Sequence, residues 1–263
     1  MKSFSKVMRN RYKKDKRSAI IIYFVLRILV IICGVLSIIN GNYRHALICL
    51  LALLLFTLPT IVQKTLKFEL PNTFEAIVYF FIFAAEILGD VNRFYVTVPH
   101  FDTILHTMTG FLSAAVGFAL VDLLDRKSKK LDLTPIFIVV VAFCFSMTIG
   151  VLWEFFEYTG DQLFIADMQK DTIVTNFSTS KIDESRRVYI TDVVETQIKT
   201  KDGKVYTINN GYIDIGINDT MKDLFVNMIG AIVFCIFGVA YLKNQRENAF
   251  AKKFIPKNIK KRE

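Results

Sequence analysis

The chain has 263 residues, of which 53% are hydrophobic, and its mean hydropathy is +0.40. A soluble domain of this length is rarely so apolar. The formal charge of +9 does not arise from an isolated basic domain of the kind that binds nucleic acid, because the basic residues lie between and outside long apolar runs. This pattern is typical of an integral membrane protein. The lipid bilayer is therefore the expected partner, and no nucleic acid is expected.

Six apolar runs are predicted to be transmembrane helices, because about 20 helical residues span the hydrocarbon core of a bilayer. The first follows a basic segment, residues 1–17, and ends at Asn40 without the small-residue cleavage site of a signal peptide. Residues 18–158 hold the first five helices. The predicted spans are Ser18–Ile39, Tyr43–Val62, Thr73–Leu88, Phe101–Leu124, Thr134–Tyr158 and residues 222–242. The predicted fold class is an all-α polytopic membrane protein, a six-transmembrane-helix bundle.

The basic residues predict the orientation of this bundle. Twenty-two of the 33 lysines and arginines fall in four segments that six helices would place on one side: the N-terminus, the second-to-third connection, the fourth-to-fifth connection and the tail, residues 243–263. The short connections on the other side hold only Arg44 and Arg93. By the positive-inside rule, both termini are predicted to be cytoplasmic, in the plasma membrane of a bacterium.

Residues 159–221 are then predicted to be an extracytoplasmic loop. Part of the loop alternates polar and β-branched residues, and Asp202-Gly203 follows this stretch. An Asp-Gly pair between such runs is a good signal for a two-stranded turn. We expect a small β-hairpin over the outer face, which could be a lid, a docking element or a neutral insertion.

Acids and one histidine recur at the non-cytoplasmic ends of the third to sixth helices. Their spacings of three and four residues give each helix a polar stripe on one face. Charged groups within a bilayer are costly and are usually paired or functional. The stripes are Glu86 and Asp90; Asp102 and His106; Glu154, Glu157 and Asp161; and Asp219, Asp223 and Asn227. The predicted orientation puts all four at one depth, which is the main indication of a functional site.

The eight carboxylates outnumber the cations expected near them, which are Arg93, Lys222 and a protonated His106. Some acids must be protonated, form salt bridges, or bind a metal ion. Carboxylates with one imidazole suit Mg²⁺, Mn²⁺ or Ca²⁺, and Zn²⁺ also accepts them. The candidate metal ligands are Asp102, His106, Glu154, Glu157, Asp219 and Asp223. Glu86, Asp90, Asp161 and Asn227 are further polar residues of the expected site.

A structural role for some of these acids stays open. Asp102 could simply cap the fourth helix, and the outermost acids could lie among lipid headgroups. The outermost acids are Asp90, Asp161 and Asp219. Four residues lie at least one turn deeper and favour a functional role: His106, Glu154, Asp223 and Asn227. Small residues such as Gly110, Gly150 and Gly230 continue the stripes, so these helix faces are predicted to pack closely.

Three motifs follow one another along residues 70–242. They are Asp-x-x-x-His-x-x-x-Gly at Asp102–Gly110, Trp-Glu-x-x-Glu at Trp153–Glu157, and Asp-Thr-x-x-Asp-x-x-x-Asn-x-x-Gly-Ala at Asp219–Ala231. In this order they resemble the YjdF-like bacterial inner-membrane proteins, a family of uncharacterised function. They are more distantly similar to VanZ-like proteins, which share the histidine–glycine helix, the glutamate of the next helix and the Asp-x-x-x-Asn-x-x-Gly-Ala helix.

This resemblance implies a bacterial cytoplasmic membrane protein of several helices. It also implies that the motif acids, His106 and Asn227 matter for its function. VanZ-like proteins are associated with tolerance to glycopeptides, so the analogy suggests a role in the cell envelope. The long loop between the fifth and sixth helices departs from the usual pattern, and the substrate does not carry over.

The sequence leaves three functions open. In the first, a metal held by the acids and His106 activates water, Glu154 or Glu157 is the general base, and the substrate is a lipid or lipid-linked envelope precursor. The catalytic candidates are then His106, Glu154 and Glu157. In the second, the protein is a proton- or cation-coupled transporter. In the third, it is a structural or regulatory membrane protein whose acids hold helices together. Neither the substrate nor the oligomeric state follows from the sequence.

Overall fold

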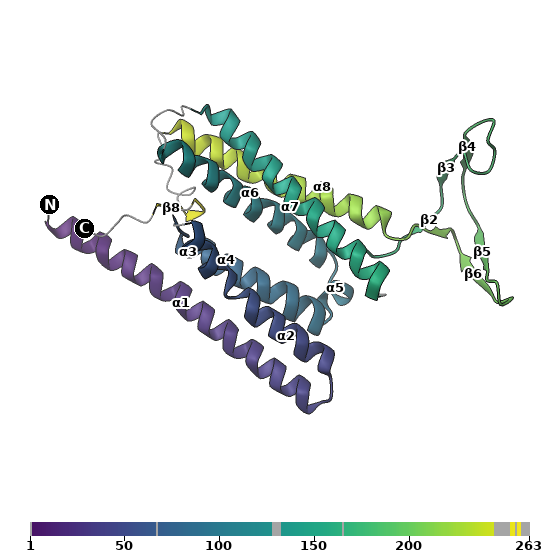
Figure 1. Ribbon diagram of the computed structural model, residues 1–263, viewed down its shortest axis with the longest axis horizontal. Coiled ribbons are helices and arrows are strands. Elements are labelled where there is room, and N and C mark those ends of the chain that lie inside the picture. Colours follow the sequence, from purple (N-terminus) through teal and green to yellow (C-terminus); the bar gives the residue numbers. More distant parts are fainter. Residues whose placement is uncertain are drawn as a thin grey trace. The chain divides into compact units, whose positions relative to one another are not determined.

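The structure is a computed structural model that describes residues 2–66, 68–127, 133–164, 166–244, 253–255 and 257–258 (Figure 1). Most of the predicted basic tail lies outside the described residues, as do Lys129 and Lys130 and the side chains of the basic N-terminus. The chain forms two compact units. The bundle unit comprises residues 1–150 and 226–263, and the loop unit comprises Val151–Phe225.

Within the described residues, five helical segments are long and apolar enough to cross a membrane. They are Ala19–Ile39, Tyr43–Thr65, Phe101–Asp125, Pro135–Phe164 and Ile217–Lys243. The predicted third span, Thr73–Leu88, is not among them. The protein is thus mostly helical with several membrane-spanning helices, and a sixth span stays a prediction.

The first two spans form a helical hairpin in the bundle unit. Helix α1 (Lys2–Ile39) and helix α2 (Tyr43–Leu55) lie side by side, so closely that a Cβ on Gly34 would be only 3.2 Å from Cys49 Cβ (Figure 1). The second predicted helix is broken, because α3 (Leu58–Leu66) starts anew after Phe56. Pro59 has no amide hydrogen, and a proline is tolerated in the first turn of a helix but not in its interior. Hydropathy alone does not reveal this break.

The third predicted helix changes its winding halfway. Helix α4 (Asn72–Phe83) continues into η1 (Ala84–Val91), a π-helix in which the Asn92 amide donates to the Ile87 carbonyl at 2.9 Å. A Cβ on Gly89 would lie 2.3 Å from the ring of Tyr95, in the short helix α5 (Phe94–Thr97). Only glycine allows the ring to approach so closely. The third predicted span is therefore an α-helix followed by a π-helix, and the short helix α5 that comes next packs back against the π-helix.

Helices α6 (Phe101–Lys127), α7 (Pro135–Phe164) and α8 (Ile217–Lys243) form the rest of the bundle. In the bundle unit, α6 and α8 run in parallel, because Phe111 packs on Phe234 and Phe118 packs on Tyr241. Helix α7 runs in the opposite direction to α8. Ser146 of α7 contacts Asn227, whereas Val139, which comes earlier in α7, contacts Cys235, which comes later in α8. Their shared core contains Phe118, Ala142 and Phe234, and the polar residues Asp122 and Ser146 are buried as well.

Two of these helices are longer than hydropathy predicts. Helix α7 starts at Pro135, with Thr134 Oγ1 accepting from the Phe137 amide at 3.3 Å, and runs to Phe164 rather than Tyr158. Helix α8 starts at Ile217 rather than residue 222. Both added segments include polar residues, and helical hydrogen bonding does not depend on the polarity of the side chains. Asp161 and Asp219, expected at loop boundaries, are therefore helical.

A short strand pair ties the chain's C-terminal part back to the bundle. Strand β1 (Phe68–Glu69) follows α3, and it pairs antiparallel with β8 (Lys257–Asn258). Ile255 next to β8 is buried, and Phe254 packs against the core of the bundle. The C-terminal segment and the α3–α4 connection therefore lie together at one end of the bundle unit (Figure 1).

The loop unit carries the strands between α7 and α8. Among the described residues of this unit, three antiparallel pairs are present: β2 (Ile173–Val174) with β7 (Tyr212–Ile213), β3 (Phe177–Thr179) with β4 (Val188–Ile190), and β5 (Glu195–Lys199) with β6 (Val205–Asn209). The last pair encloses Asp202-Gly203, and Gly203 has a φ of +86°. Positive φ costs glycine little, which suits it to the turn between β5 and β6.

Candidate functional site

The α6 stripe begins with an ion pair in the bundle unit. His106 Nε2 lies 3.6 Å from Asp102 Oδ1, one helical turn earlier, and the histidine is only 7% exposed. A carboxylate beside an imidazole orients the ring. The two residues predicted to act together on this helix therefore do contact each other.

One turn further along α6, glycines let three helices meet closely. A Cβ on Gly110 would lie 1.9 Å from the Asn227 carbonyl oxygen, and a Cβ on Gly230 would lie 2.0 Å from the Thr107 carbonyl oxygen. A Cβ on Gly150 would lie 2.8 Å from Asn227 Nδ2. We call the contact of Gly110, Gly150, Asn227 and Gly230 the glycine junction. The predicted close packing of the small-residue faces is thus present within the bundle unit.

Asn227 is the polar residue at the centre of the glycine junction. It is 1% exposed, and its Nδ2 donates to the Ser146 carbonyl at 3.5 Å, while Ser146 Oγ donates to the Gly110 carbonyl at 2.8 Å. Asn227 Oδ1 is buried and accepts no hydrogen bond from the described part of the chain. A buried acceptor without a donor costs about 1–3 kcal/mol. This oxygen is therefore suited to a water molecule or a cation.

The α7 stripe lies in the loop unit. Glu154 and Glu157 are buried at 4% and 8% exposure, although they are carboxylic acids on a helix whose neighbouring side chains are exposed. Trp153 Nε1 donates to Glu157 Oε1 at 2.8 Å, which orients that carboxylate. The spacing of three residues places both acids on the buried face of α7, as the sequence predicts.

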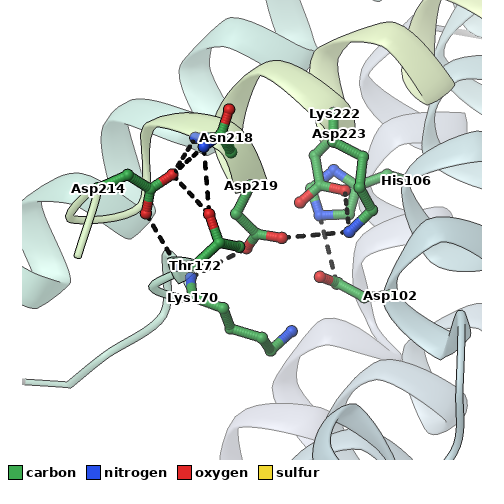
Figure 2. A network of polar contacts seen from close by, with 9 residues as sticks. All are labelled: Asp102, His106, Lys170, Thr172, Asp214, Asn218, Asp219, Lys222 and Asp223. Carbon is green, nitrogen blue, oxygen red and sulfur yellow. Dashed lines mark hydrogen bonds and ion pairs between the residues drawn. The ribbon is translucent and has the colours of Figure 1, made fainter. Parts of the chain in front are cut away.

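The first part of the α8 stripe, Asp219 and Asp223, lies in the loop unit beside a lysine. Lys222 Nζ lies 3.2 Å from Asp219 Oδ1 and 3.8 Å from Asp223 Oδ1, so it bridges two buried carboxylates (Figure 2). The other oxygen of Asp219 accepts from the Lys170 amide at 3.0 Å. Asp219 therefore has partners for both oxygens within the loop unit.

Asp161 also anchors the chain that follows α7. Its two carboxylate oxygens accept from the amides of Met168 and Gln169, at 2.5 and 2.8 Å. The side chain of Gln169 in turn donates to Thr220 Oγ1 on α8. Asp161 and Asp219 thus hold one short segment against both helices.

Asp214 is a polar residue that the helical stripes did not reveal. It is 9% exposed and accepts from the Thr172 amide at 2.8 Å, from Thr172 Oγ1 at 2.8 Å, and from the Gly216 and Asn218 amides (Figure 2). Burial raises the pKa of Asp214, but the hydrogen bonds from Thr172 and Asn218 outweigh it and lower the pKa to about 2. Gly216, two residues after Asp214, has a φ of +78°. The sequence Asp-x-Gly-x-Asn at residues 214–218 was the signal that could have identified Asp214 as a residue at the start of a helix.

The remaining predicted residues lie apart in the chain from these three helices. Glu86 is half-buried and Asp90 is exposed, and both belong to the π-helix η1. Carboxylates and imidazoles are residue types that bind metal ions in proteins. The bundle unit contributes Asp102 and His106 of this kind, and the loop unit contributes the buried acids Glu154, Glu157 and Asp223.

Comparison with known proteins agrees with this description. Residues 21–244 match the family described as "Predicted membrane protein (DUF2238)". An uncharacterized protein of Thermotoga maritima is 28% identical over 105 residues, which cover 40% of this chain and 53% of that relative. The chain thus spans about half the length of the curated relative it matches. No solved structure is similar. Because the match covers most of the chain, including all three motifs, the protein belongs to the DUF2238 family of predicted membrane proteins.

Proposed function

We propose that this protein binds a divalent cation at the non-cytoplasmic ends of α6, α7 and α8, and uses it in chemistry on a lipid or lipid-linked envelope substrate. In this proposal six helices cross the bacterial plasma membrane and both termini are cytoplasmic. The pairing of β1 with β8 supports the orientation, because it joins the C-terminal segment to the α3–α4 connection that the charge bias assigns to the same side.

The geometry of the glycine junction carries the proposal. His106 precedes Gly110 by four residues, Glu154 follows Gly150 by four residues, and Asp223 precedes Asn227 by four residues. Since α7 runs opposite to α6 and α8, all three steps lead in the same direction from the junction, each by about one 5.4 Å turn. An imidazole and two carboxylates are therefore expected at one depth, with Asp102 and Glu157 on the same stripes.

The chemistry of these residues supports a cation. Buried carboxylates require compensating positive charge, and Asn227 Oδ1 is a buried acceptor without a hydrogen-bond donor among the described residues. Mg²⁺, Mn²⁺ and Ca²⁺ prefer oxygen ligands, and Zn²⁺ accepts imidazole with carboxylates. We assign Asp102, His106, Glu154, Glu157 and Asp223 as ligands. Asp219 and Asp161 are left with the structural contacts that hold residues 168–170.

A bound divalent ion would supply an activated water molecule at neutral pH. The chain's own part is to orient the ligands and to provide a general base. Glu157, held by Trp153, and Glu154, one turn from the glycine junction, are the two candidates for that base. The envelope substrate in this proposal is an analogy with VanZ-like proteins, and the site residues themselves do not select it.

Loss of metal in His106→Ala is the expected result that tests this proposal. Removing one ligand should weaken metal affinity by about 100-fold or more, so the purified variant should carry far less metal than the wild type. Elemental analysis of detergent-purified protein, after equilibration with each of the four ions, measures the stoichiometry. Circular dichroism and gel filtration check that the variant folds.

The matched control for this test is His45→Ala. His45 hydrogen-bonds to Asn42 at the start of α2, far along the chain from the site, and its loss should leave the metal content unchanged. Wild-type protein that binds none of the four ions would contradict the proposal. Ion flux into proteoliposomes that requires His106 would instead support the transporter alternative.

A further inference from the structure

Lys222 occupies an unusual place on α8. Its side chain is 48% exposed, yet its ammonium group lies between Asp219 and Asp223, whose side chains are 6% and 1% exposed (Figure 2). The lysine follows Asp219 by three residues and directly precedes Asp223. A flexible side chain that reaches in from the solvent-exposed side of the helix thus supplies positive charge to two buried carboxylates.

The two contacts of Lys222 are unequal. Its nitrogen is 3.2 Å from Asp219, which is also held by the Lys170 amide at 3.0 Å, and 3.8 Å from Asp223. Lys222 could therefore move away from Asp223 while keeping its closer partner. Such a movement needs only rotation about the bonds of the flexible four-carbon stem, which is half-exposed.

A second observation points to a ligand beside Asp223. Asn227 follows Asp223 by one turn of α8, is 1% exposed, and leaves Oδ1 without a hydrogen-bond donor among the described residues. An amide oxygen is a common neutral ligand for a hard cation and cannot be satisfied by another acceptor. The carboxylate of Asp223 and this oxygen thus lie on one helix face, and both favour a positive charge.

We propose that Lys222 is a tethered counter-ion that supplies the charge at Asp223 when no metal is bound and is displaced by the incoming divalent ion. This inference rests on the proposed function, because it concerns the same metal site. A metal must then compete with a cation that is covalently attached to the protein. A divalent ion competes better than a monovalent one, so Lys222 contributes selectivity for divalent ions and sets the concentration at which they bind.

Mn²⁺ titration of Lys222→Gln tests this role in the full-length protein. Removing the competing charge should make Mn²⁺ bind about tenfold more tightly, an effect kept modest because the lysine is half-exposed and screened by solvent. Lys222→Arg, which keeps the charge, should bind Mn²⁺ as the wild type does. Lys243→Gln, at the other end of the same helix, is the matched control and should change nothing. Paramagnetic resonance of free Mn²⁺ measures each affinity.

The outcomes separate the inference from the proposed function. If the wild type binds Mn²⁺ and Lys222→Gln binds it with equal or weaker affinity, the counter-ion role is overturned while the metal site is retained. Absence of Mn²⁺ binding in every variant, together with absence of binding of the other three ions, would overturn both. If Lys222→Gln does not fold, Lys222→Met provides the same charge removal, and a tighter affinity in that variant would support the inference.

Discussion

Replacing Gly110 with alanine is expected to force α6 and α8 apart and so to destabilise the protein. The new Cβ would lie 1.9 Å from the Asn227 carbonyl oxygen, which is backbone and cannot rotate away. Overpacking against side chains typically costs about 1–3 kcal/mol, so the cost here should be at the upper end or beyond it. Gly230→Ala should behave alike, because its Cβ would lie 2.0 Å from the Thr107 carbonyl oxygen. Unfolding in a titration with denaturing detergent measures the loss.

Gly238→Ala is the control for this prediction. It lies on the same helix, α8, but the nearest atoms to its new Cβ belong to the Phe118 ring at 3.0 Å, which can shift slightly. Its cost should be clearly smaller than that of the junction variants. Equal stability of Gly110→Ala and the wild type would show that the glycine junction is not a tight helix contact.

Replacing Asp214 with alanine is expected to release the segment that leads into α8. The change removes the carboxylate that accepts hydrogen bonds from the amide and hydroxyl of Thr172 and from the amides of Gly216 and Asn218. Hydrogen bonds to a charged acceptor contribute about 1.5–3 kcal/mol each, although their losses do not add fully. We expect the local stability of the loop unit to fall by about 3 kcal/mol or more. Amide hydrogen exchange at Thr172 and Asn218 measures it.

The ionisation of Asp214 makes the same contacts dependent on pH. Its pKa is lowered from 3.8 to about 2 by the hydrogen bonds that it accepts in the folded protein. The stabilisation is therefore complete above about pH 4 and is lost as the pH falls through about 2. Asp183→Ala, which removes contacts only with Ser185 and Arg186, should leave exchange at Thr172 unchanged. Protection of Thr172 that survives in Asp214→Ala would contradict this account.

The glycine and asparagine spacing on α6, α7 and α8 predicted close packing, and the structure contains it. The periodicity alone could not show which backbone atoms approach each glycine. That depends on the crossing of two helices, which brings the Asn227 carbonyl oxygen rather than a side chain against Gly110. The role of Asp219 was likewise undecided, because its partner, the Lys170 amide, is 49 residues away along the chain.

Hydropathy predicted where the apolar spans lie but misjudged several ends. The first turn of α8 and the last turns of α7 include polar residues, and the break near Pro59 lies within an apolar run. The π-helix η1 was also not expected, because hydropathy does not distinguish between α-helical and π-helical winding. Average polarity reports where a segment lies, whereas the ends and the winding of a helix depend on its backbone hydrogen bonds.

The sequence by itself determined that this is a membrane protein with several apolar helices, and it predicted polar stripes on four of them, because hydrophobic length and residue spacing are local properties. Only the tertiary structure decided that Lys222 bridges Asp219 and Asp223, that Asp214 organises the start of α8, and that Asn227 lies at the junction of three helices. These features depend on side-chain direction and on contacts between distant residues.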